Sequence, residues 1–230
     1  MTTQELLDHG TIPPHRAQTN RPWTPQRAPF VAVWTDERAV LAKDLVLKRN
    51  GKGITWKDGE TPQDRDRFGA LWARLEGHQG AGTPVFDEMA PIRQRDCFLH
   101  RRCQVCRKPA SQTDKGQLFL RTTDDPGPEK ARVTQPPVCL PCAADSTRRC
   151  KHLRGRALAV RSKKPRLRTA LGVAYSPLPD GILYAAGPVD VPLRDKARLR
   201  WVLVSHYEAE LHQCTIVDLD EELKHHDAAA

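Results

Sequence analysis

Cys103-Gln-Val-Cys106 and Cys139-Leu-Pro-Cys142 are two Cys-x-x-Cys pairs near the middle of the chain, separated by residues 107–138. One tight backbone turn can present both sulfurs of a pair to one ion. Two such pairs therefore supply four thiolates, the complete tetrahedral shell of a structural zinc site. The alternatives are two redox dithiols or four buried cysteines without a ligand. A redox dithiol usually occurs as one pair between a strand and a helix, so the second pair favours zinc.

The sequence around the two pairs predicts the elements that carry them. The arginine-rich stretch from Met89 to Arg102 is expected to be a helix leading into the first pair, and Gly116–Arg121 is expected to be a strand. Residues 143–150, after the second pair, have helical composition. In the treble-clef arrangement, a turn that holds one Cys-x-x-Cys pair (a knuckle) is followed by a hairpin and then by a second knuckle at the start of a helix. The dipole of that helix faces the thiolates. The predicted fold class is α+β, with a treble-clef-like zinc module over residues 89–155.

Four stretches in this region carry a resemblance to known proteins. They are Met89-Ala-Pro-Ile-Arg-Gln-Arg95, Cys103-Gln-Val-Cys-Arg-Lys-Pro-Ala110, Pro136-Pro-Val-Cys-Leu-Pro-Cys142 and Cys150-Lys-His-Leu-Arg154. This region, about 65 residues long, resembles uncharacterised treble-clef or zinc-ribbon-like proteins of actinobacteria. The resemblance implies metal binding and no agreed activity. It does not extend to residues 1–88 or to the C-terminal strands.

Further candidate ligands lie beside the two pairs. Cys97 and His100 precede the first pair at steps of three residues, so on one continuous helix they would share a face with it. Cys150 and His152 follow the second pair by about one helix length. These four residues could form a second metal site, or one histidine could replace a thiolate in the first. The simpler alternative is that Cys97 and Cys150 pack as small apolar side chains.

The sequence lacks the motifs that accompany the zinc ligands in common zinc enzymes. Nucleobase deaminases combine His-x-Glu with a later Pro-Cys-x-x-Cys, whereas here His206-Tyr-Glu208 follows the cysteines and Val138 separates Pro137 from Cys139. No His-Glu-x-x-His, Gly-x-Ser-x-Gly, phosphate-binding loop or dinucleotide fingerprint is present. Residues 107–138 contain no histidine, which argues against an intact HNH nuclease site and leaves a non-catalytic relative of that scaffold open. No catalytic residue is assigned, and a zinc enzyme with an open coordination position remains an alternative.

Composition indicates an intracellular protein with many loops. Nineteen prolines, 14 glycines and a hydrophobic content of 39% are consistent with extensive irregular structure. The sequence has no run of 18 apolar residues and no secretory signal at residues 1–10, so we expect no membrane span and no export. An odd number of cysteines, seven, fits a reducing cytoplasm better than a disulfide framework.

The positive charge of the chain is concentrated in one segment. Ten Lys or Arg residues lie between Arg148 and Arg168, and residues 146–179 contain no Asp or Glu. Without these ten charges, the net charge of +9 falls to −1. Such a segment predicts contacts with the phosphates of duplex DNA or structured RNA, and scarce aromatics argue against single strands. The residues predicted to bind nucleic acid are Arg148, Arg149, Lys151, Arg154, Arg156, Lys163 and Lys164. A solvated surface and a protein-interaction or assembly module are the alternatives.

The remaining segments are predicted from local patterns. Residues 1–30 form a proline-rich extended arm with a short helix at 4–8, and residues 31–88 form an α+β segment. In that segment we expect a strand over Phe30–Trp34, a hairpin turning at Asn50-Gly51, and a helix starting at Thr61 with Phe68, Leu71, Trp72 and Leu75 on its apolar face. Residues 156–220 are expected to be β-rich, with strands at 157–160, 166–175 and 182–186, while 205–213 fits helix or strand. The tail, 221–230, is expected to fray.

Overall fold

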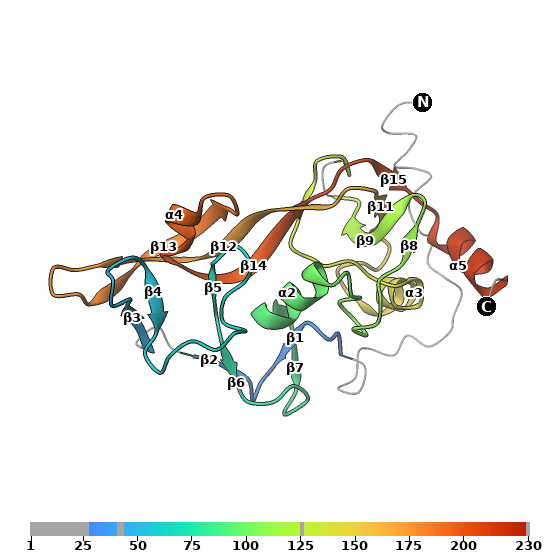
Figure 1. Cartoon of the computed structure of the whole chain (residues 1–230). Coiled ribbons are helices and arrows are strands. Elements are labelled where there is room, and N and C mark those ends of the chain that lie inside the picture. Colours follow the sequence, from blue (N-terminus) through green and yellow to red (C-terminus); the bar gives the residue numbers. More distant parts are fainter. Residues whose placement is uncertain (1–27, 41–43, 125–126, 229–230) are drawn as a thin grey trace. The chain divides into compact units, whose positions relative to one another are not determined.

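The structure, a computed structural model, describes residues 28–40, 44–124 and 127–228 (Figure 1). It contains helices and strands, with more strand than helix. The described residues form two compact units: unit 1 holds residues 28–31, 96–124, 127–166 and 210–228, and unit 2 holds residues 32–40, 44–95 and 167–209. Each unit therefore combines stretches that are far apart in sequence. The helix expected at 4–8 and most of the N-terminal arm lie outside the described residues. Among the described residues, no helix has the length and apolarity needed to cross a membrane.

Unit 1 is built around an antiparallel sheet with the strand order β15-β11-β9-β8. Its strands are β8 (Gln112–Thr113), β9 (Gly116–Thr122), β11 (Ala157–Ser162) and β15 (Cys214–Ile216), and β10 (Arg132–Val133) lies in the same unit. All six residues of β11 are buried. Gly116 starts β9 at a φ of +106°, and a side chain there would overlap the Ser162 carbonyl, so the β8–β9 turn requires glycine. The strands expected at 116–121 and 157–160 are confirmed.

Two predicted helices are confirmed, with bounds that the local chemistry explains. The helix expected over residues 89–102 is α2 (Pro91–Leu99). It ends because Arg101 adopts a left-handed φ of 53° and the Arg102 N–H donates to the Cys97 carbonyl at 2.9 Å, a Schellman-type stop. The second is α3 (Leu140–Arg149), which begins directly after Cys139.

The prediction of a frayed tail is wrong for most of that segment, because α5 (Leu219–Ala228) is a helix. Asp218 Oδ1 accepts the N–H groups of Asp220 and Glu221 and so caps its first turn. Acidic residues in the first turn and histidines in the last suit the helix dipole. Leu219 is buried in one hydrophobic cluster with Cys103, Leu118 and Ala143, so α5 covers the core of unit 1.

Unit 2 contains a twisted ribbon of long strands and three short strand pairs. The long strands are β12 (Arg166–Pro177), β13 (Leu183–Pro192) and β14 (Val202–Glu210), and β5 (Leu71–Trp72) pairs with β14 in parallel. The short pairs are β1 (Ala32–Trp34) with β7 (Pro84–Met89), β2 (Arg38–Ala39) with β6 (Leu75–Glu76), and β3 (Leu45–Leu47) with β4 (Ile54–Trp56). A one-turn helix, α4 (Lys196–Leu199), precedes β14. The expected strands at 30–34, 166–175 and 182–186 are confirmed, and β14 assigns most of 205–213 to strand.

The hairpin predicted at Asn50-Gly51 is present. Strands β3 and β4 pair with Leu45 opposite Trp56 and Leu47 opposite Ile54. Gly51 adopts a φ of +67° in the turn between them, a conformation that favours glycine.

The helix predicted from Thr61 is wrong. Asp64 accepts hydrogen bonds from the N–H and hydroxyl of Thr61, which closes a local turn instead of starting a helix. Asp66 Oδ1 accepts the N–H groups of Phe68 and Ala70, and this side chain competes with helical pairing of the backbone. Trp72 is fully buried on β5, beside β14. The helical spacing of Phe68, Leu71, Trp72 and Leu75 therefore reflects burial on β5 and in the residues beside it.

Candidate metal centre

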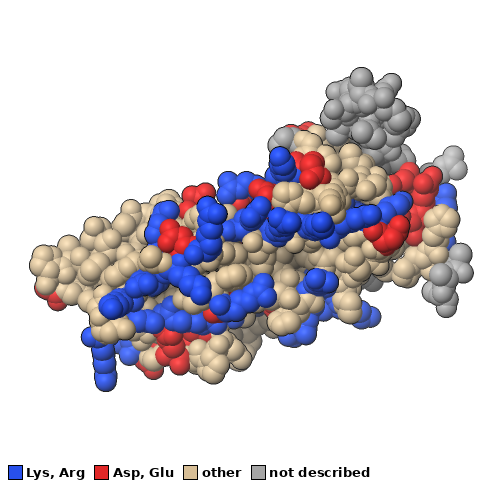
Figure 2. Space-filling model, turned by 45° about the horizontal axis from the view of Figure 1, so that its top comes forward, with Lys and Arg blue, Asp and Glu red and all other residues tan. Residues whose placement is uncertain are grey.

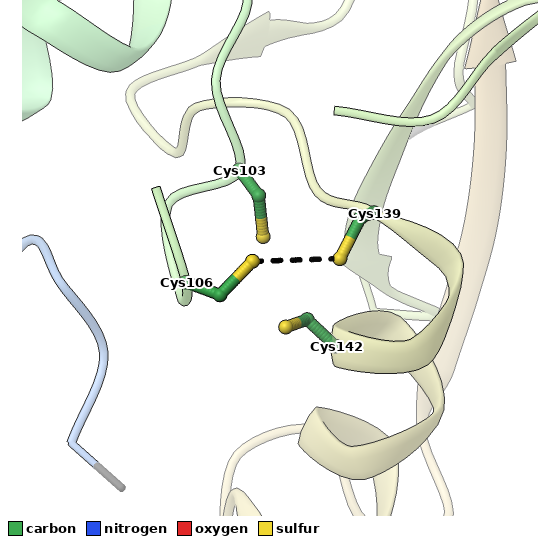
Figure 3. A group of neighbouring side chains, drawn as sticks. All are labelled: Cys103, Cys106, Cys139 and Cys142. Carbon is green, nitrogen blue, oxygen red and sulfur yellow. Dashed lines mark hydrogen bonds between the residues drawn. The ribbon is translucent and has the colours of Figure 1, made fainter. Parts of the chain in front are cut away.

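Four cysteine side chains converge in unit 1. Cys103, Cys106, Cys139 and Cys142 place their sulfur atoms within 4.8 Å of one another, and the side chains point toward a common centre (Figure 3). Two come from the loop after α2 and two from the start of α3. Among the described residues, no other group of three or more His, Cys, Asp or Glu side chains gathers in this way. The arrangement can hold one metal ion.

The first pair lies in a tight turn held by its own backbone. The Cys103 N–H donates to the Lys108 carbonyl at 2.7 Å, and the Arg107 N–H donates back to the Cys103 carbonyl at 2.9 Å. Arg107 adopts a left-handed φ of 63°, which reverses the chain directly after Cys106. The Val105 N–H points at Cys103 Sγ at 3.4 Å and can stabilise negative charge on that sulfur. This loop therefore presents both sulfurs to the same side.

The second pair lies at the start of α3. Cys139 is the N-cap residue with extended φ and ψ of −87° and 157°, Pro141 occupies the first turn, and Cys142 follows. The unpaired N–H groups and the positive dipole end of the helix favour thiolates at this position. Proline suits the first turn because it gives up an N–H that has no helical acceptor there.

Backbone hydrogen bonds fix the two pairs opposite each other. Gln104 donates through its N–H to the Pro137 carbonyl at 3.0 Å and through its side-chain amide to the Pro136 carbonyl at 2.8 Å. The Ser111 N–H donates to the Val138 carbonyl, and the Val138 N–H donates to Leu118 in β9, each at 2.9 Å. The sheet thus holds both loops, and the site does not depend on one flexible segment.

The four thiols differ in exposure and in protonation. Cys103 is fully buried, Cys139 and Cys142 are half-buried, and Cys106 is exposed. Hydrogen bonds from the Cys139 and Cys142 thiols lower the pKa of Cys103, and the same contacts raise the pKa values of Cys139 and Cys142. The Cys103 thiolate therefore forms readily, and its negative charge opposes ionisation of Cys139 and Cys142. A divalent cation would remove this opposition because its charge favours every thiolate.

The additional candidate ligands lie outside this group. Cys97 is buried on α2, its Sγ lies 3.8 Å from the Cys103 carbonyl, and burial raises the pKa of its thiol to about 12. His100 is paired with Asp96 at 2.9 Å. Cys150 caps the C-terminus of α3 and His152 follows in the next turn. Helix α2 ends at Leu99, so Cys97 and His100 do not lie on one continuous helical face with Cys103 and Cys106.

The basic residues predicted to bind nucleic acid all lie in unit 1 and differ in their surroundings. Lys151, Arg154, Arg156, Lys163 and Lys164 are exposed, while Arg148 and Arg149 are half-buried. Arg149 donates to Asp145 and Arg156 to Asp124, each at 2.6 Å. On the face drawn in Figure 2, Lys and Arg side chains form extended areas with Asp and Glu interspersed.

One member of the basic segment has a structural role that the sequence did not indicate. Arg161 is fully buried on β11 and forms an ion pair with Glu222 of α5 at 2.5 Å. It also donates to the Gly116 carbonyl and to Ser111 Oγ. This network ties α5 to the sheet that supports the metal centre. A run of charged residues alone gives no signal for it, because the acidic partner lies 61 positions away.

Comparisons of the chain with models of protein families, with curated proteins and with solved structures give no match.

Proposed function

We propose that the four cysteines bind one zinc ion in a closed, treble-clef-like module, and that this module binds nucleic acid through exposed Lys and Arg residues that follow it. The observation that carries the proposal is the convergence of four sulfurs, from two separate elements, within 4.8 Å of one another. A tetrahedral shell of four thiolates suits zinc or iron–sulfur chemistry. We propose zinc because two Cys-x-x-Cys pairs, one on a loop and one at the start of a helix, are typical of structural zinc sites.

The spacing of the sulfurs fits this ion. A Zn–S bond of about 2.3 Å implies a tetrahedral S–S edge of about 3.8 Å. Cys106 Sγ and Cys139 Sγ lie 3.7 Å apart. A shell filled by four thiolates has no position for a substrate, so the proposed role of the ion is structural.

The order of elements supports a treble-clef-like module. A knuckle at Cys103–Cys106 is followed by the β8–β9 hairpin, and the second pair starts α3. Cys103 belongs to the same buried cluster as Leu118 of β9 and Ala143 of α3, with Cys139 and Cys142 packed against it. The zinc would thus complete a small hydrophobic core, as in modules that fold only with metal.

The proposed nucleic-acid contacts depend on Lys and Arg residues in a segment of the sequence that contains no acidic residue. Lys151, Arg154, Lys163 and Lys164 are exposed in unit 1, and residues 146–179 contain no Asp or Glu. Exposed Lys and Arg bind phosphates without reading sequence, so the proposal predicts salt-dependent affinity for duplex DNA or structured RNA.

Fluorescence anisotropy with a labelled duplex DNA and a labelled RNA hairpin, using metal-loaded protein, tests the nucleic-acid step. Lys163→Gln with Lys164→Gln should weaken binding and reduce the slope of log K against log salt by about 1.8, at about 0.9 for each phosphate contact. Lys52→Gln with Lys57→Gln makes the same charge change at exposed positions in unit 2 and should leave the slope within about 0.5. Absence of binding at low salt by fully loaded protein, or equal effects of both pairs, would refute it.

A further inference from the structure

Cationic side chains gather on the loop that carries the first cysteine pair. Between Glu88 and Asp114 the sequence contains a single acidic residue, Asp96. Beside the pair it contains four cations that the nucleic-acid contacts proposed above do not include: Arg101, Arg102, Arg107 and Lys108. We refer to these four residues as the knuckle cations.

The backbone brings the two ends of this loop together. The Cys103 N–H donates to the Lys108 carbonyl at 2.7 Å, and Arg102 forms an antiparallel bridge with Pro109. The segments before and after the cysteine pair therefore run side by side. Cations from both ends of the loop lie on adjacent stretches of backbone.

One carboxylate orients two of the guanidinium groups. Asp96 Oδ2 lies 3.4 Å from Arg102 Nη1 and 3.5 Å from Arg107 Nε. The Arg107 guanidinium also lies over the Phe30 ring, 5.0 Å from its centroid. Each contact with Asp96 uses one of the five N–H donors of an arginine, so donors remain for another anion. A single negative charge faces two permanent positive charges, and the loop keeps an excess of positive charge that is held in place.

The knuckle cations reach solvent. The side chains of Arg102 and Arg107 are 37% and 55% exposed, and Arg101 and Lys108 are exposed. Three of the four are arginines, whose planar fork of donors binds two phosphate oxygens at once. Phosphate groups are therefore the ligand chemistry that suits this loop.

The rival role for these cations is to neutralise the metal shell, because one divalent ion with four thiolates carries more negative than positive charge. Other groups already stabilise the sulfurs. The Val105 N–H points at Cys103 Sγ at 3.4 Å, and the second pair lies at the positive end of α3. Arg107 instead faces Asp96 and Phe30. This orientation favours an external anion as the partner of the loop.

We propose that the knuckle cations form a second phosphate-contact site, on the metal-binding loop itself, in the nucleic-acid interaction proposed above. The site rests on that proposed function and extends it, because the metal would then order residues that bind phosphate as well as complete a hydrophobic core. The contact reads no base sequence, since Lys and Arg on phosphates contribute charge alone.

Fluorescence anisotropy of metal-loaded protein over a series of salt concentrations, with a labelled duplex DNA and a labelled RNA hairpin, tests the site. Arg107→Gln with Lys108→Gln should reduce the slope of log K against log salt by about 1.8, at about 0.9 for each phosphate contact. The matched control, Lys115→Gln with Lys224→Gln, removes two charges at exposed positions of unit 1 and should leave the slope within about 0.5. Adding Lys163→Gln and Lys164→Gln to the first pair should bring the total reduction to about 3.6, because the two sites make separate contacts.

A second variant keeps the ion pairs of Asp96 intact. Arg101→Gln with Lys108→Gln should lower the slope as much as the first pair does, and zinc content measured on each variant separates phosphate contact from neutralisation of the shell. A normal effect of the Lys163 and Lys164 changes, with no effect of either knuckle pair, would overturn the site and leave the proposed function standing. So would weaker binding that occurs only in variants that have lost zinc. Absence of binding by loaded wild type would refute both.

Discussion

Replacing Glu222 by Ala should destabilise unit 1 strongly, because it removes the carboxylate partner of a fully buried guanidinium. Arg161 has no exposed side-chain area, and Glu222 is 16% exposed. Arg161 Nε and Nη2 donate to the Glu222 carboxylate at 2.7 and 2.5 Å. In the variant, Arg161 keeps only the Gly116 carbonyl and Ser111 Oγ as acceptors.

The expected loss is about 3 kcal/mol in the free energy of unfolding. Removing one member of a buried ion pair costs about 3–5 kcal/mol, and the lower end applies because water can reach the edge of the Glu222 site. Changing both partners, Arg161→Met with Glu222→Leu, should restore most of the loss, since an apolar pair leaves no buried charge.

Urea unfolding of metal-loaded protein, followed by far-ultraviolet circular dichroism, measures the effect, and hydrogen exchange of α5 amides locates it. Glu221→Ala is the matched control, because Glu221 lies in the same helix turn and is exposed. The reasoning would be refuted if Glu222→Ala and Glu221→Ala differed by less than about 0.5 kcal/mol, or if the double variant were the least stable.

Three further predictions follow from the same structure. Chelation of the metal should unfold the loops of Cys103 and Cys142 and leave unit 2 intact, seen as loss of exchange protection confined to unit 1. Burial alone would raise the pKa of Asp64, but hydrogen bonds from Arg74 and Thr61 lower it to about 2. Its stabilisation should therefore be complete above about pH 4 and fade as pH falls toward 2, so wild type should lose its advantage of about 2 kcal/mol over Asp64→Asn in acid unfolding. Tyr207→Phe should cost about 1–2 kcal/mol in urea unfolding, because the buried hydroxyl donates to Asp66 Oδ2 at 2.6 Å; no change would contradict the assigned hydrogen bond.

Local chemistry made the four-cysteine cluster predictable from sequence. Each Cys-x-x-Cys pair is a short-range motif, so its turn geometry does not depend on the rest of the fold. The Asn50-Gly51 hairpin was predictable for the same reason, since a two-residue signal fixes the backbone conformation. The two pairs are held opposite each other by hydrogen bonds of Gln104, Ser111 and Val138, which the two motifs alone do not reveal.

The errors arose where distant pairing overrides local pattern. Phe68, Leu71 and Trp72 recur at helical spacing, yet Leu71 and Trp72 pair with Leu203 and Val204 of β14, which no local pattern reveals. The tail was expected to fray on composition, but Glu222 on its helix pairs with Arg161, 61 positions earlier in the chain. The exposure of Leu178, Ile182 and Tyr184 was equally hidden, because alternation in a strand does not tell which side the core covers.

Metal content and coordination of the purified chain, measured by elemental analysis and zinc-edge X-ray absorption, test the central claim most directly. We expect one zinc ion per chain, bound by four sulfur atoms at about 2.3 Å, with no nitrogen or oxygen ligand. Substitution of Cys103 or Cys142 by Ser should abolish this signal, and Cys97→Ser should leave it unchanged. Loops of Cys103 and Cys142 that stay folded without metal, or a shell with fewer than four sulfurs, would contradict a structural zinc site.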